Sequence, residues 1–329
     1  MKIKHISKWI LIPLLCGLLF GAARLYYHLT DDFRLSNMTY ELDFDAPWKA
    51  PVISADELHD LNTDLGQKYY YIGKGAQCYA FGSADGNYVL KFFKFKHLKP
   101  NFLVYFLPAF SPFKEYREAS IQRKRNKLIS VFEGYDLAFR VNRKESELIY
   151  LHLVPTERQF RTVTVVDKLG LEHAIHLDDV VFLFQKKGET LRTRMTRLLQ
   201  QGKQEAAKNS LSKILAMYMQ EYQKGVYDRD HGVMHNTGFI GEHPFHLDVG
   251  KFTEDERMKQ KDYYKKDLEH ITWKIDVWVK KTFPDDYAAL STHLSKDFLM
   301  WTGEAFDPAS IDPGLYKKNR HHLSWSFGN

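Results

Sequence analysis

The N-terminal region contains an uncharged apolar segment. Three lysines precede a run from Trp9 to Ala23 that contains no charged residue, and Arg24 follows it. A run this apolar has no polar face to present to water, so residues 1–27 are predicted to form one N-terminal transmembrane helix, a signal anchor. Small residues near its end also fit a cleavable signal peptide, and that alternative stays open.

Aromatic and β-branched runs begin at residue 68. The segments KYYYIGKG, CYAFGS and YVLKFF have the composition of strands, and Asp85-Gly86-Asn87 is a turn signal between the last two. Together they predict an antiparallel meander. The acidic segment before them, residues 28–67, is predicted to be a linker that wraps into the following domain.

Helical periodicity appears next, and the two kinds of pattern separate along the chain. Residues 114–141 predict a helix, because apolar residues recur every three or four positions among many charges. Strand-like runs follow, and then amphipathic helical segments, one of which is predicted to end at Gly225. This order predicts an α+β fold with two lobes, a β-rich N-lobe over residues 68–186 and an α-helical C-lobe over residues 187–329.

Other apolar and polar positions have a default structural interpretation. The run from Phe102 to Phe110 is predicted to pack in the core, with a membrane-dipping segment as the alternative. In the C-terminal helical region, Trp273, Val277 and Trp278 are core candidates. Because no HExxH or paired histidine spacing indicates a metal site, four histidines are interpreted as solvated loop residues. These are His231, His235, His243 and His246.

The composition narrows the classes of partner. Lys and Arg total 47 and Asp and Glu total 41, a net charge of +6 that is spread over many short clusters. This balance suits an anionic surface or a phosphate ligand. Nucleic acid is not an expected partner, because no zinc-finger spacing, RNP-like strand or basic zipper is present. Cys16 and Cys78 are too few for an intradomain disulfide framework or a cysteine-based zinc site.

The first candidate site is a glycine-containing turn followed by a strand lysine. The segment from Gly73 to Phe81 reads GKGAQCYAF, and Lys91 lies in the apolar run YVLK. This pair resembles the glycine-rich loop GxGxxGxVF and the VAIK lysine of protein kinases, with Cys78 in place of the third glycine. The resemblance implies that Gly73, Gly75 and Lys91 bind the phosphates of ATP.

A carboxylate partner for the lysine is expected on the helix that follows. Glu118 is the predicted residue, since at about 100° per residue it lies nearer the apolar face than Glu133 does.

The second candidate site combines a polar loop with a following strand. Asp228-Arg229-Asp230 and Asn236 resemble the HRDxxxxN catalytic loop of protein kinases, and Asp248-Val249-Gly250 resembles DFG. The resemblance implies that Asp230 orients the acceptor hydroxyl and that Asn236 and Asp248 hold Mg²⁺. Asp228 stands where the family has histidine and the loop is one residue longer, so Asp228 is an alternative catalytic base.

These motifs predict an ATP- and Mg²⁺-dependent phosphotransferase, either a divergent protein kinase or a kinase of the sugar and lipopolysaccharide type. No APE-like sequence follows the DVG segment, so the sequence does not determine the acceptor. The expected acceptor is a hydroxyl group on a protein, a glycan or a lipid headgroup. The expected partners are ATP, that acceptor and the membrane. One N-terminal segment is expected to span the membrane, and the sequence does not determine on which side the domain lies. The alternative is a pseudokinase that binds nucleotide or protein without turnover.

Overall fold

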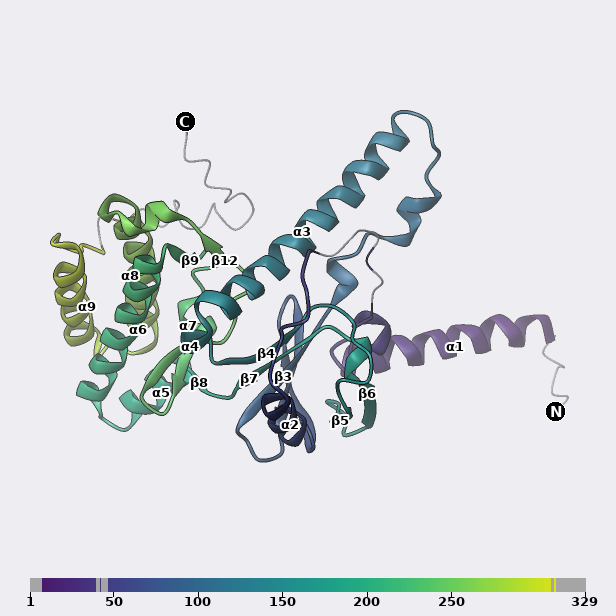
Figure 1. Ribbon diagram of the computed structural model, residues 1–329, viewed down its shortest axis with the longest axis horizontal. Coiled ribbons are helices and arrows are strands. Elements are labelled where there is room, and N and C mark those ends of the chain that lie inside the picture. Colours follow the sequence, from purple (N-terminus) through teal and green to yellow (C-terminus); the bar gives the residue numbers. More distant parts are fainter. Residues whose placement is uncertain (1–7, 40–41, 43–46, 309–310, 312–329) are drawn as a thin grey trace, which may run out of the picture. The chain divides into compact units, whose positions relative to one another are not determined.

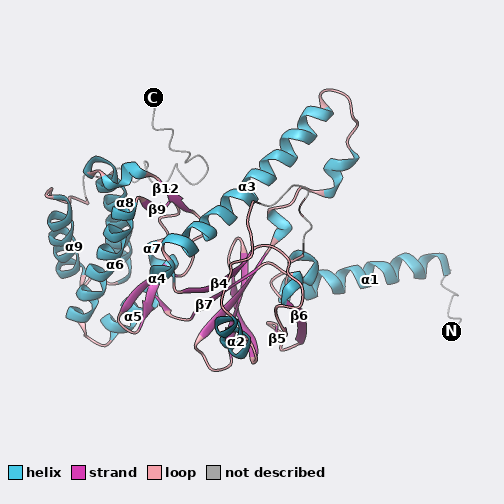
Figure 2. Cartoon of the chain, viewed as in Figure 1, coloured by secondary structure: helices cyan, strands magenta, loops and turns pink. Residues whose placement is uncertain are grey.

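The structure, a computed structural model, describes residues 8–39, 42, 47–308 and 311. It divides into two compact units, which we call the sheet unit and the helical unit. The sheet unit comprises Met1–Leu128 and Ile149–Lys187, and the helical unit comprises Ile129–Leu148 and Gly188–Asn329. Strands dominate the first and helices the second (Figures 1 and 2). The predicted α+β class is confirmed, whereas the arrangement as two kinase-like lobes stays a prediction.

A seven-stranded sheet forms the centre of the sheet unit, in the order β4-β7-β3-β2-β1-β5-β6. Neighbours β1, β2, β3 and β7 pair antiparallel, so the predicted meander is confirmed, and β1 pairs with β5 in parallel. The strands are β1 Lys68–Lys74, β2 Cys78–Ser83, β3 Tyr88–Phe93, β4 Leu148–His152, β5 Thr162–Val166, β6 Glu172–His176 and β7 Phe182–Lys186.

The segment between the apolar N-terminus and the sheet contributes to the core. Phe33, Met38 and Leu61 are buried in one cluster with the side chains of β1, β2 and β3. Leu61 belongs to α2 (Ala55–Asp64), which begins with a capping box between Ser54 and Glu57. Part of the segment 28–67 therefore packs into the core of the sheet unit.

The N-terminal apolar run forms α1, Lys8–Leu29. Its window Ile12–Leu29 has a mean hydropathy of 1.3, and none of the window is buried. Within the part of the chain that the structure describes, this is the one helix long and apolar enough to cross a membrane, a test that a signal sequence also passes. Membrane insertion itself stays a prediction.

Three long helices pack together in the helical unit, namely α6 (Gln204–Lys224), α8 (Lys261–Thr282) and α9 (Tyr287–Thr302). As predicted, α6 ends at Gly225, whose φ of 74° favours glycine. On α8 the buried face carries Ile275 and Val279, which leaves Val277 43% exposed. The core prediction for Val277 is therefore wrong, because a position two residues from Ile275 points to the opposite side of a helix.

The rest of the described chain consists of one more long helix and several short helices and strands. The long helix α3 covers Phe113–Val141 and confirms the predicted helix. The remaining helices are α4 Arg143–Ser146, α5 Leu191–Gln200 and α7 Val233–Asn236, and the 3₁₀ helices are η1 Leu35–Asn37, η2 Phe95–His97, η3 Phe102–Phe106, η4 Leu177–Asp179 and η5 Glu256–Lys259. The small strands of the helical unit are β8 Glu189–Thr190, β9 Val226–Asp228, β10 Thr237–Ile240, β11 His243–His246 and β12 Phe252–Glu254.

The apolar run at η3 faces solvent. The exposed fractions are 68% for Phe102, 79% for Phe106 and 63% for Phe110. The prediction that this run packs in the core is wrong, because the 3₁₀ helix and the extended residues after it present the rings outward rather than toward the sheet. Its alternative, contact with a membrane, stays a prediction.

Candidate functional site

The glycine turn joins β1 and β2 in the sheet unit. The Gly75 N–H donates to the carbonyl of Cys78 over 2.9 Å and closes the turn. A Cβ atom placed on Gly73 or on Gly75 would meet no atom within 4 Å. Packing therefore does not require glycine at either position, and the backbone is open to close approach by a ligand. Cys78, which replaces the third glycine of the kinase pattern, is 7% exposed and belongs to the core.

Lys91 lies on β3 between β2 and β7, opposite Ala80 and Leu183. Its amine donates to Oε1 of Gln185 over 2.9 Å, and Gln185 is 2% exposed. The buried amide thus fixes the direction of the lysine side chain. Sequence reasoning did not single out Gln185, although the strand-like run DDVVFLFQKK contains it.

Glu118, predicted to pair with Lys91, is exposed in the N-terminal part of α3. The first fifteen or so residues of this helix carry mostly exposed side chains, and the buried face begins at Leu128. Helical periodicity correctly predicted the buried face of the second half, with Leu128, Val131 and Phe132 among its members. The pairing of Glu118 with Lys91 stays a prediction.

In the helical unit the two aspartates of the polar loop have opposite environments. Asp228 ends β9, pairs with Phe252 of β12 and is 1% exposed. The side chain of Asp230 is 40% exposed. The backbone N–H of Asp230 donates to Oδ1 of Asp228 over 2.9 Å, so the buried residue holds the loop that presents the exposed one.

Two neighbours hold the carboxylate of Asp230. The Asn236 amide donates to Oδ2 over 3.1 Å, and the amine of Lys251 lies 2.9 Å from Oδ1. Although partial burial raises the pKa of Asp230, the bonds from Lys251 and Asn236 lower it more, and the net shift is downward. Asp230 is therefore an oriented, ionised and solvent-accessible carboxylate at neutral pH. Sequence reasoning missed Lys251, which directly follows the DVG segment.

Asn236 also connects this loop to Asp248. Its backbone carbonyl accepts the N–H of Leu247 over 2.7 Å and that of Asp248 over 3.4 Å. Oδ1 of Asp248 accepts the Tyr135 hydroxyl over 2.9 Å and the Gly250 N–H over 3.1 Å. The predicted residues Asp230, Asn236 and Asp248 thus belong to one continuous set of hydrogen bonds.

The helix α3 reaches this set through Gly134. A Cβ atom on Gly134 would lie 2.9 Å from the carbonyl oxygen of Gly250, so the close approach requires glycine. The next residue, Tyr135, supplies the hydroxyl bound to Asp248. The sequence predicted the helix that contains Tyr135 but assigned this residue no role, because its partner is more than a hundred residues away.

Two buried histidine–carboxylate pairs lie next to the loop that contains Asp228 and Asp230. Nε2 of His246 lies 2.9 Å from Glu221, and both side chains are fully buried. Burial lowers the pKa of His246, but the charges of Glu221 and Asp228 raise it more. His231 is 5% exposed and lies 2.5 Å from Asp267. The interpretation of His231 and His246 as solvated loop residues is therefore wrong, since each is buried against a carboxylate.

Burial raises the pKa of Asp228 to about 6, although His246 and His231 act in the opposite direction. Its Oδ2 atom is buried and has no hydrogen-bond partner among the described residues. A carboxylate in such a place is a structural support with a high energetic cost, and it is not accessible to a substrate.

The metal-binding capacity of the region is limited. Among the described residues, no group of three or more His, Cys, Asp or Glu side chains could hold a metal ion. Mg²⁺ does not need such a group, because it is commonly bound by one or two carboxylates together with water and substrate phosphates. Oδ2 of Asp248 and Oδ1 of Asn236 accept no hydrogen bond from a described side chain, so both suit this kind of ligation.

The comparisons with known proteins give little further guidance. No protein-family model matches the chain, and no curated protein matches it either. The chain is similar to solved structures of WbdD, in one case with 14% identity and a TM-score of 0.33 over 69% of this chain and 45% of WbdD.

Other structures of the same protein give similar values. One is WbdD with the kinase inhibitor LY294002, at 13% identity and a TM-score of 0.32. Another, described as the bifunctional kinase-methyltransferase WbdD, has 12% identity and a TM-score of 0.32. The chain spans less than half the length of these structures, and TM-scores this low identify neither a fold family nor an activity.

Proposed function

We propose that the chain is an ATP- and Mg²⁺-dependent phosphotransferase with a two-lobed, protein-kinase-like fold, tethered to a membrane by α1. The observation that carries the proposal is the continuous hydrogen bonding of Asp230, Asn236 and Asp248. These residues come from two separate motifs, and structural packing alone does not require an exposed aspartate, an amide and a second aspartate to be held together.

The nucleotide is assigned to groups of both motifs. The open backbone at Gly73 and Gly75 and the amine of Lys91 would bind the phosphates. Asp248 and Asn236 would hold Mg²⁺, which neutralises charge on the phosphate oxygens when bound. Tyr135 binds Oδ1 of Asp248, so Oδ2 would be the oxygen offered to the cation.

Asp230, not Asp228, is the residue assigned to the acceptor. In the proposed reaction a hydroxyl oxygen of a protein, glycan or lipid headgroup bonds to the γ-phosphorus of ATP. The bond from that phosphorus to the β–γ bridging oxygen breaks, and the hydroxyl proton passes to Asp230. Asp228 is unsuited to this role because it is 1% exposed, whereas Asp230 is reachable from solvent.

The test compares three aspartate variants of the full-length protein in detergent. Asp248→Asn should weaken Mg²⁺-dependent ATP binding and turnover together, because it removes a charge that binds the cation. Asp230→Asn should leave ATP binding nearly unchanged and lower turnover by roughly a hundredfold or more. Asp285→Asn, an exposed residue outside the site, is the matched control and should change neither.

The outcomes separate the enzyme from the pseudokinase. Wild-type protein that binds ATP with Mg²⁺ but transfers phosphate to no acceptor would favour the pseudokinase. One observation favours this alternative, namely that Lys251 already occupies the carboxylate of Asp230. Wild-type protein that binds no ATP would contradict the phosphotransferase and the nucleotide-binding pseudokinase, and would leave only a pseudokinase that binds protein.

Membrane tethering has its own measurement. An uncleaved α1 should keep the protein in the membrane fraction through an alkaline wash, as expected for a spanning helix. Release of a soluble form that lacks the residues up to about Ala23 would show instead that the segment is a cleaved signal peptide.

A further inference from the structure

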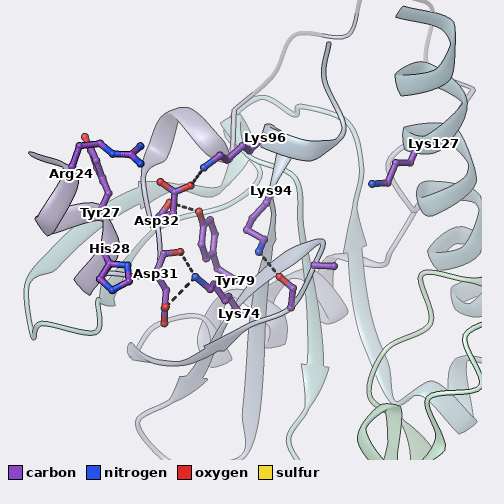
Figure 3. A pocket seen from close by; sticks show the side chains of 12 residues that line it. Arg24, Tyr27, His28, Asp31, Asp32, Lys74, Tyr79, Lys94, Lys96 and Lys127 are labelled. Atoms are coloured by element: carbon purple, nitrogen blue, oxygen red, sulfur yellow. Dashed lines mark hydrogen bonds and ion pairs between the residues drawn. The ribbon is translucent and has the colours of Figure 1, made fainter. Parts of the chain in front are cut away.

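A cavity of about 640 Å³ lies in the sheet unit, and Lys91 is not among the residues that line it (Figure 3). Its walls come from four places along the chain, one of which is Lys127 of α3. Arg24, Tyr27 and His28 belong to the end of α1, Gly75 and Ala76 belong to the glycine turn, and Lys94 and Lys96 follow β3. The cavity therefore joins the end of the predicted membrane helix to the outer surface of the glycine turn.

The lining has an excess of positive charge. Five of its side chains are lysine or arginine: Arg24, Lys74, Lys94, Lys96 and Lys127. Its two carboxylates are already shared between cations. Asp31 lies 3.0 Å from Lys74 and 3.1 Å from Lys168, and Asp32 pairs with Arg34 and Lys96. Neither carboxylate forms an ion pair with Arg24 or Lys94.

Lys94 is the group that most needs an anion. Its side chain is 8% exposed, and its amine donates to the Gly75 carbonyl and lies 5.1 Å from the centre of the Tyr79 ring. Among the described residues, no carboxylate is within ion-pair distance of this amine. Burying an ammonium group without an opposite charge is costly, and burial lowers the pKa of Lys94 accordingly. An anion in the cavity would offset that cost.

We propose that this cavity binds a phosphate group, at a site separate from that of the ATP phosphates. Several lysine and arginine donors converging on one space suit a phosphate with several acceptor oxygens. The end of α1 supplies part of the wall, and a spanning α1 would bring the cavity to the level of lipid headgroups. The phosphate is that of an anionic lipid headgroup or of a soluble phosphate ester.

The proposal also concerns the glycine turn. Lys94 holds the Gly75 carbonyl, and its backbone N–H donates to the carbonyl of Gln77 over 2.7 Å. A phosphate bound at Lys94 would therefore lie next to Gly75, a residue of the turn assigned to ATP. Asp248→Asn distinguishes the two sites, because it removes a ligand of the Mg²⁺ that would bind with ATP and leaves the lining of the cavity unchanged.

The test measures binding to the full-length protein in detergent micelles by calorimetry. The soluble probe is glycerol 3-phosphate, and the lipid probe is short-chain phosphatidylglycerol, with phosphatidylcholine as the lipid that has no net charge. Wild type and Asp248→Asn should bind a phosphate probe alike. Lys94→Met should weaken binding at least tenfold, Arg24→Gln should weaken it less, and Lys94→Arg should retain it. Lys114→Met, an exposed lysine outside the cavity, is the control.

The pattern of probes identifies the source of the phosphate. Binding of phosphatidylglycerol alone would assign the cavity to lipid headgroups, and binding of both probes would assign it to phosphate esters in general. Three results would overturn the proposal: no binding of either probe to wild type, equal binding to folded Lys94→Met, or competition by ATP, which would make this the nucleotide site.

Discussion

The glycine turn of the sheet unit and the aspartate loop of the helical unit are held in different ways. Backbone hydrogen bonds and the amine of Lys94 hold the glycine turn, and a Cβ atom on Gly73 or Gly75 would meet no atom within 4 Å. The aspartate loop rests on buried charges, with Glu221 and His246 fully buried behind it.

The difference indicates two tasks. A turn whose backbone is open can follow the shape of a ligand, whereas a loop fixed by side chains can hold a carboxylate in one direction. The cost of that fixation is carried by buried groups such as Asp228, which touch no ligand themselves. Substitutions in the two regions should therefore affect different quantities, stability in the loop and affinity in the turn.

The largest effect is expected when the buried ion pair is broken. Glu221→Ala removes the partner of His246 and of the Asn142 amide, and leaves an uncompensated buried charge. We expect the free energy of unfolding to fall by about 3–5 kcal/mol, measured by urea denaturation of the full-length protein in detergent. Glu205→Ala, at an exposed position of the same helix, should change it by less than about 1 kcal/mol. Similar losses for both variants would contradict the comparison.

A pH series tests the cost of burying Asp228. Its pKa is about 6 in the folded chain, against an ordinary 3.8, so the folded state binds more protons between these values. The free energy of unfolding should fall as the pH rises from about 4 to about 6, by on the order of 3 kcal/mol. Asp228→Asn removes this contribution, and the variant should gain stability relative to wild type across that window.

Above about pH 6 the difference between Asp228→Asn and wild type should stay constant. Urea denaturation at several pH values measures it, and Asp285→Asn serves as the control because its side chain is exposed. Parallel pH profiles for Asp228→Asn and wild type would show that burial of this carboxylate has little cost.

Two glycine substitutions sharpen the comparison directly. Gly134→Ala places a methyl group against the backbone of Gly250 and should destabilise the protein by about 1–3 kcal/mol. Gly73→Ala meets no protein atom and should leave stability nearly unchanged, while it weakens ATP binding if the nucleotide approaches this backbone. Thermal unfolding and ATP titration distinguish the two, and a stability loss at Gly73 would remove the distinction.

The smallest effect on stability is expected in the exposed apolar run. Phe102→Ser and Phe106→Ser together should change the free energy of unfolding by no more than about 1 kcal/mol, since both rings face solvent. No acidic residue occurs between Asp85 and Lys114, while four lysines do, a balance that favours an anionic membrane. If the run contacts lipid, binding of a form lacking residues 1–27 to anionic vesicles should fall, and unchanged binding would exclude that contact.

The sequence by itself determined the local elements. Alternation and periodicity predicted the meander and the helices, and Gly225 predicted a helix end. These predictions succeed because strand and helix periods, and the conformational freedom of glycine, act over a few neighbouring residues.

Tertiary structure decided which polar residues are buried. It placed Asp228 inside and Asp230 outside, two residues apart, and it brought Tyr135 of α3 to Asp248. It also turned the run from Phe102 outward, where composition alone favoured the core. Burial depends on what other elements pack against a position, and those partners are distant in sequence, so no local pattern contains the information.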